Sequence, residues 1–192
     1  MNAALQAIAD NREILYWQLL GNRSACHNRE WLACILASWA LGKSGLPDYL
    51  GLSCAAFQQL LDTYFPGSAL SDFKPTGKTA DFSRMLEKDD LQQLLMRYAR
   101  EDNQQTQSIA AIIVTACLGD DHLWQDLGLW NRAQLTELLR YNFPELAEKN
   151  SHDMKWKKFI YKQLCEAEGL FVCRAPSCGV CIDYQKCYGS EK

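Results

Sequence analysis

The chain has 192 residues, of which 48% are hydrophobic and 22% charged, and its formal net charge at pH 7 is −3. This composition is ordinary for a globular protein and excludes wholesale disorder or a fibrous repeat. No apolar run approaches the roughly 18 residues of a membrane-spanning helix, and the first residues do not resemble a secretory signal. We therefore expect a cytoplasmic protein with no membrane segment.

Charge is distributed unevenly along the chain. Residues 1–148 hold 12 basic and 18 acidic side chains, whereas residues 149–192 hold 8 basic and 5 acidic ones. This basicity is far below that of a nucleic-acid-binding domain, and no groove-reading helix motif is visible. We expect no nucleic acid partner, and a local anion suits the basic end better.

Apolar residues recur at intervals of three and four along most of the chain, which predicts an all-α fold. Ser53 and Asn131 are typical helix N-caps, and Gln134 follows Asn131 in capping-box position. Residues expected to end helices are Gly42, Pro66, Gly119 and Pro144. The predicted helices are Ala3–Leu20, Arg29–Leu41, Ser53–Tyr64, Phe82–Ala99, Thr106–Leu118, Asn131–Asn142 and Asp153–Ala167.

Part of the first half recurs 77 residues later. ILASWALGKSGLPDYLGL, from Ile35, lies over IIVTACLGDDHLWQDLGL, from Ile112; after a slip of one residue, SCAAFQQLLDTYFP lies over NRAQLTELLRYNFP. Because glycine and proline positions match as well as leucines, we predict an internal duplication of a two-helix unit, spanning about 29–66 and 106–144. Two ordinary helical hairpins with similar caps are the alternative.

The end of the chain carries four closely spaced cysteines, in the pattern C-x4-C-x2-C-x5-C: Cys173, Cys178, Cys181 and Cys187. We predict a helical domain over residues 1–168 and a C-terminal metal-binding loop over 169–192, because four thiolates in a short loop can wrap one metal centre. Structural zinc usually has two C-x-x-C knuckles, and only one is present here. The spacing leaves an iron–sulfur cluster and zinc open, with disulfides disfavoured in a reducing compartment.

The segment before the cysteines reads as an amphipathic helix. Its apolar stripe is Trp156, Phe159, Ile160, Leu164 and Ala167. A second face carries Lys155, Lys158 and Lys162, and Arg174 lies within the cysteine loop. These cations are either an ordinary solvated face or a surface that favours an anionic centre and an oxyanion substrate.

Other potential ligands are scattered. His122 and His152 are candidates for an additional ligand, and His122 is preferred because Gly45 stands at the matching position of the first repeat. Cys165 is expected to be a small buried residue. The remaining thiols, expected either in the core or near the surface, are Cys26, Cys34, Cys54 and Cys117.

The cysteine spacing, preceded by MKWKKFIYKQLCEAEG and by HLWQDLGL and FPELAEKN, resembles the NifQ family. The resemblance implies an iron–sulfur protein that takes up molybdenum, carries it as a molybdenum–iron–sulfur cluster and donates it to assembly of the nitrogenase iron–molybdenum cofactor. The implied partners are a molybdenum source such as molybdate, the cofactor scaffold complex and the nitrogenase iron protein. We expect no enzymatic activity, and the alternative is a zinc-stabilised protein-interaction module with a four-cysteine structural site.

Overall fold

The computed structural model describes residues 3–21, 27–68, 70 and 75–167. These residues form nine α-helices and no strand, which confirms the all-α prediction. Two short 3₁₀ turns, η1 (Asp48–Gly51) and η3 (Phe82–Arg84), connect some of them. The helices are α1 (Ala3–Leu20), α2 (His27–Ala40), α3 (Cys54–Tyr64), α4 (Lys88–Arg97), α5 (Gln104–Ala116), α6 (Leu123–Leu127), α7 (Arg132–Asn142), α8 (Pro144–Lys149) and α9 (Trp156–Ala167).

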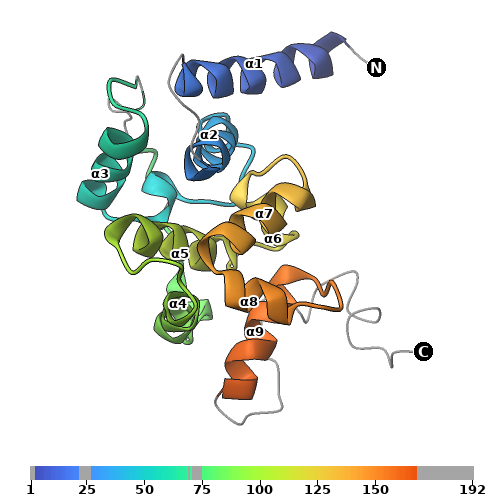
Figure 1. Cartoon of the computed structure of the whole chain (residues 1–192). Coiled ribbons are helices and arrows are strands. Elements are labelled where there is room, and N and C mark those ends of the chain that lie inside the picture. Colours follow the sequence, from blue (N-terminus) through green and yellow to red (C-terminus); the bar gives the residue numbers. More distant parts are fainter. Residues whose placement is uncertain (1–2, 22–26, 69, 71–74, 168–192) are drawn as a thin grey trace.

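Helices α2 and α5 form the centre of the molecule (Figure 1). Every residue of α2 from Trp31 to Trp39 is buried, and so is most of α5 from Ile109 to Ala116. Helix α1 packs on α2 and α4 packs on α5, while α3 and α7 lie to either side. Helices that are apolar on nearly all sides must be covered on all sides, which explains this central place.

The predicted N-caps are confirmed. The Ser53 hydroxyl accepts a hydrogen bond from the Ala56 N–H at 3.2 Å, and the Asn131 side chain accepts one from the Gln134 N–H at 2.9 Å. The Gln134 side chain accepts from the backbone N–H of Trp130 at 2.8 Å. The reciprocal bond of the capping box is therefore made one residue earlier than expected.

The prediction of one helix over Phe82–Ala99 is wrong. The Asp81 carboxylate accepts from the Ser83 N–H at 3.0 Å and starts the short turn η3, after which α4 begins only at Lys88. Between them Met85 leaves the helical conformation, with φ −137° and ψ 79°. This bend buries Met85 while Leu86 stays 88% exposed, so core packing overrides the helical period here.

Two short helices were not expected, and the last helix begins later than expected. Pro144 begins α8 instead of only ending α7, because proline lacks the N–H that the first helical residue does not use. Helix α6 ends at Gly128, whose φ of 82° suits glycine. Helix α9 begins at Trp156 rather than Asp153, since Asp153 has a left-handed φ of 50°.

Helices stand at corresponding places in the two predicted repeats: α2 and α3 in the first, α5 and α7 in the second. Two contacts between the repeats are reciprocal. A Cβ added to Gly51 would lie 2.5 Å from Thr115 Oγ1, and one added to Gly128 would lie 2.7 Å from Ser38 Cβ. Ser38 and Thr115 are themselves at matching positions. The duplication itself stays a prediction.

Within the described ranges, no helix has the length and apolar character needed to cross a membrane. The predicted C-terminal loop, 169–192, lies outside the described residues, so the division into two parts at 168 stays a prediction.

Candidate metal centre

The four cysteines at positions 173, 178, 181 and 187 lie outside the described residues, as does Arg174. The structure describes the helix that leads to them, α9, and the elements that hold this helix. Across the described ranges there is no group of three or more histidine, cysteine or acidic side chains that could hold a metal. The structure therefore describes helix α9, which leads to the cysteines, and the residues that hold this helix.

Helix α9 packs its predicted apolar stripe against the domain. Trp156, Phe159, Ile160 and Leu164 are buried, whereas Ala167, the last residue of the helix, is exposed. The Trp156 indole N–H donates to Thr136 Oγ1 at 3.1 Å. Helix α9 also contacts α4, near the middle of the chain (Figure 1).

The three predicted lysines, here called the lysine face, are Lys155, Lys158 and Lys162. Lys155 and Lys158 are half-buried, and Lys162 is exposed. Lys162 Nζ lies 3.7 Å from Glu166 Oε1, one turn further along α9. Such an exposed ion pair contributes little to the free energy of folding. Lys162 can therefore leave Glu166 and bind another anion at little cost.

A fourth lysine, Lys157, was missed by the sequence reasoning. Its side chain is only 11% exposed. Nζ donates to the carbonyl oxygens of Gly119 and Asp121, both at 2.7 Å, and to the carboxylate of Asp126. Burial raises the pKa of Asp126, and the adjacent Lys157 ammonium opposes this rise.

Two glycines make room for the Asp126 carboxylate. A Cβ added to Gly119 would lie 2.2 Å from Asp126 Oδ1, and one added to Gly45 would lie 2.9 Å from the same atom. The Gly45 N–H also donates to the Asp126 carbonyl at 2.9 Å. The carboxylate thus occupies a space that larger residues at either position would close.

The signal for Lys157 was present in the sequence. Its neighbours on the same helical face are Ile160, Tyr161 and Leu164, three or four residues or two turns away, and all three are apolar. A lysine on an apolar face requires a buried anion. Only Lys155, Lys158 and Lys162 were assigned to the basic face, and Lys157 was not considered.

His122 stands at the N-cap of α6, in the loop that Lys157 holds. It is exposed, its carbonyl accepts from the Gln125 and Asp126 N–H groups at 2.8 and 3.0 Å, and its N–H donates to the Gln125 side chain at 3.3 Å. The Asp121 carbonyl bound by Lys157 immediately precedes it. The ion pair therefore ties the backbone beside His122 to the start of α9.

His152, the second histidine candidate, lies just before α9. Its side chain is exposed, and its Nδ1 lies 3.2 Å from Ser151 Oγ. No described cysteine or acidic group joins it in a metal-binding cluster.

The connector into α9 is held from the outside as well. The Arg132 guanidinium donates to the Asp153 carboxylate at 2.7 Å and to the carbonyls of Asp153 and Met154 at 2.8 and 3.1 Å. The Asn150 side chain accepts from the Met154 N–H at 2.8 Å and donates to its carbonyl at 3.0 Å. Helix α9 thus starts from a fixed point.

Of the described cysteines, Cys34, Cys117 and Cys165 are buried and Cys54 is exposed; all four are free thiols. The expectation that Cys165 is buried is confirmed. Burial raises the pKa of Cys34 and of Cys117 to about 12. At neutral pH these two thiols are protonated, and a thiol binds metal as the thiolate.

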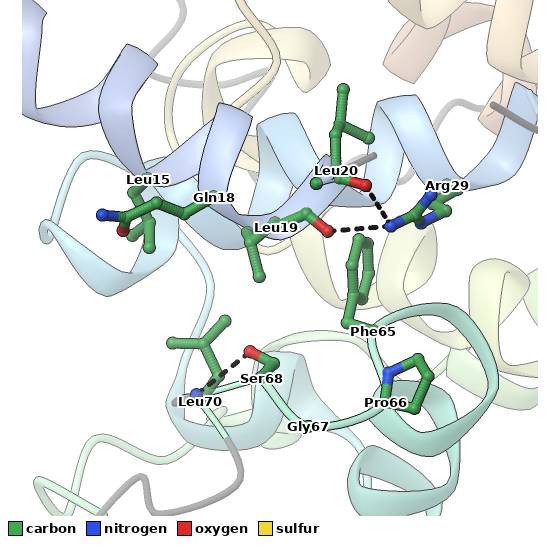
Figure 2. A pocket seen from close by; sticks show the side chains of 11 residues that line it. Leu15, Gln18, Leu19, Leu20, Arg29, Phe65, Pro66, Gly67, Ser68 and Leu70 are labelled. Atoms are coloured by element: carbon green, nitrogen blue, oxygen red, sulfur yellow. Dashed lines mark hydrogen bonds between the residues drawn. The ribbon is translucent and has the colours of Figure 1, made fainter. Parts of the chain in front are cut away.

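A hollow of about 520 Å³ lies elsewhere, between the end of α1, residues 65–68 and Leu70 (Figure 2). Arg29 enters it and donates from Nη2 to the carbonyls of Leu19, at 3.0 Å, and Leu20. Its Nε donates to the Tyr64 carbonyl at 2.9 Å. The buried guanidinium joins the carbonyl ends of α1 and α3, where helix dipoles concentrate negative charge.

Comparison with known proteins finds relatives over most of the chain. The NifQ family model matches residues 31–189, a range that includes all four clustered cysteines. The chain is 42% identical to Protein NifQ of Azotobacter vinelandii over 174 residues, covering 85% of this chain and 89% of that protein. It is 37% identical to a NifQ homolog of Sinorhizobium fredii (82% and 70% covered) and 33% identical to Protein NifQ of Klebsiella pneumoniae (83% and 97%). No solved structure matches significantly.

Proposed function

Because the chain belongs to the NifQ family, we propose that it is a cytoplasmic iron–sulfur carrier of molybdenum, without enzymatic activity, that donates the metal to assembly of the nitrogenase iron–molybdenum cofactor. The observation that carries this proposal is the position of the four cysteines: they fall inside the family match and follow directly from the anchored helix α9.

The proposed ligands are Cys173, Cys178, Cys181 and Cys187. Thiolates favour iron–sulfur clusters, and sulfide and thiolate suit reduced molybdenum better than hard oxygen ligands do. Cys34 and Cys117 are poor substitutes, since burial raises the pKa of each thiol to about 12. We expect a cluster held by a loop to be accessible to an acceptor.

The lysine face and Arg174 are proposed to favour a polyanionic cluster and an incoming oxyanion. Positive charge near the site raises the local concentration of an incoming oxyanion and stabilises the bound anionic cluster. Lys162, which is exposed and paired only loosely with Glu166, can turn toward an anion at little cost. His122 is proposed as an accessory ligand.

The proposed partners are the cofactor scaffold complex and the nitrogenase iron protein, with molybdate or another molybdenum source as the supply. They rest on the family resemblance. A rigid helical body that carries a metal-binding loop of lower local stability suits transfer of the metal to a larger assembly.

The test is the metal content of protein purified without oxygen and exposed to molybdate. The wild type is expected to be brown and to contain iron and molybdenum, and Cys178→Ala and Cys181→Ala are expected to lose both metals. Cys54→Ala, an exposed thiol outside the cluster, is the matched control and should retain them. A colourless wild type that contains zinc would instead support the zinc-stabilised interaction module.

We also propose that the scaffold arose by duplication of a two-helix unit, about residues 29–66 and 106–144. Support comes from the side-chain caps at Ser53 and Asn131, which begin α3 and α7, and from the reciprocal contacts of Gly51 and Gly128. An exchange of equivalent contacts is the pattern of a two-fold relation between like units.

A further inference from the structure

The buried pair of Lys157 and Asp126 needs an explanation other than stability. Taking two charges out of water costs free energy that their attraction only partly returns, and apolar replacements of such pairs are often as stable or more stable. Both side chains are almost completely buried, Asp126 at 5% and Lys157 at 11% exposed. A pair of this kind is most useful where it determines how two segments meet.

The hydrogen bonds around Lys157 are all satisfied in only one position of helix α9. A lysine ammonium has three N–H donors, and Lys157 has three acceptors: the carbonyls of Gly119 and Asp121 and the carboxylate of Asp126. The bare Cα atoms of Gly45 and Gly119 leave room for that carboxylate. Sliding α9 by one residue, about 1.5 Å, or rotating it would break all three bonds together.

A change in the position of α9 at Lys157 also displaces the other end of the helix. Its 12 residues span about 18 Å, so a tilt of about 10° at Lys157 would move the last turn by about 3 Å. Metal and binding sites require placement to within about 0.5 Å. Both the lysine face and the position of the last turn of α9 therefore depend on how the start of α9 is held.

We propose that Lys157 is a positioning residue: through Asp126 and the 119–121 backbone it sets helix α9, and with it the lysine face, relative to the loop that carries His122. This inference rests on the proposed function for its metal readout. The Arg132 contacts hold the connector before α9 on the exposed side, whereas Lys157 acts on the helix itself from within.

The test compares four variants. Lys157→Met leaves Asp126 buried alone, and Asp126→Leu combined with Lys157→Met replaces the pair by apolar groups. Lys157→Arg preserves the charge. Lys149→Met is the matched control, because Lys149 donates to the Tyr98 hydroxyl at 2.6 Å on the exposed surface. Each is measured for melting temperature, for amide hydrogen exchange of the metal-free protein at 119–127 and 156–167, and for bound iron and molybdenum.

We expect Lys157→Met to melt below the wild type and the double variant to regain the wild-type melting temperature. The double variant should nevertheless show exchange at 119–127 and 156–167 that is faster by about tenfold, and bound iron and molybdenum lower by about tenfold. Lys157→Arg should retain at least half the metal, and Lys149→Met should match the wild type throughout. A merely stabilising role would be rescued fully by the apolar pair.

A double variant with wild-type exchange and wild-type metal content would overturn the proposal. If the double variant does not fold, Lys157→Gln is expected to show the same rise in exchange and loss of metal, and wild-type values for it would overturn the proposal equally. A wild type that binds neither iron nor molybdenum would defeat the proposed function alone, since the metal-free exchange rates still decide whether Lys157 positions α9.

Discussion

Burial divides the described thiols into two chemical groups. Cys34 and Cys117, with pKa values of about 12, have about one thiolate in 10⁴ at pH 8 and are almost completely buried. Cys54 is exposed on the first turn of α3. Iodoacetamide at pH 8 should therefore modify Cys54 in the folded protein and spare Cys34 and Cys117.

Peptide mass spectrometry of the alkylated protein checks this prediction, and the same reaction in denaturant, where all thiols are exposed, is the control. Rapid modification of Cys117 under native conditions would show that α5 opens and that the thiol is not held in the core.

Gly42 and Gly119 occupy matching positions after α2 and α5, yet they serve different purposes. Gly42 has a left-handed φ of 67° and open space around it, so Gly42→Ala should cost only the backbone strain, about 1 kcal/mol. Gly119→Ala would put a Cβ 2.2 Å from Asp126 Oδ1 and displace the carboxylate from Lys157. We expect a loss of about 3 to 5 kcal/mol in unfolding free energy.

Urea unfolding of both alanine variants measures this difference. Equal small losses would show that Asp126 moves aside without losing its partner. The comparison also marks a limit of the sequence: the glycines were predicted as helix ends, and the space required at Gly119 depends on Asp126 and Lys157, which meet only in the fold.

Helices were predictable where a cap or a breaker acts locally. Ser53 and Asn131 mark the starts of α3 and α7, and α1 spans its predicted residues, Ala3–Leu20. The errors come from contacts distant in sequence. Met85 leaves the helical path to enter the core, and α8 starts at the proline that was expected only to end a helix. Of the site, the apolar stripe was predicted. The sequence also marks Lys157 as a lysine on an apolar face, but its partners, Asp126 and the carbonyls of Gly119 and Asp121, are brought to it only by the fold.

The break between η3 and α4 can be tested directly. Leu86 is 88% exposed, so Leu86→Lys should change the unfolding free energy by no more than about 0.5 kcal/mol. Met85 is 1% exposed, and Met85→Ala should cost about 2 to 5 kcal/mol through the cavity it leaves. Denaturant unfolding of the two variants provides the comparison. A large loss for Leu86→Lys would mean that this side chain is buried and the break misplaced.

At the scale of the whole molecule, the buried apolar residues of the described part run from Leu19 to Cys165, up to the last turn of α9. A chain that stops after Ala167 should therefore fold, with a melting temperature within about 4 °C of the metal-free full-length protein, and should bind no iron or molybdenum. A chain that stops after Asp153 lacks the buried aromatics Trp156, Phe159 and Tyr161 and should fail to fold.

Circular dichroism melting of both truncated chains, together with their metal content, checks the division at residue 168. The shorter chain is the control for the claim that α9 belongs to the helical body. If the chain ending at Ala167 also fails to fold, the C-terminal segment contributes to the core, and metal binding and folding are coupled across the whole molecule. If it folds and still binds both metals, the four cysteines are not the ligands, and the carrier function must reside in the helical body.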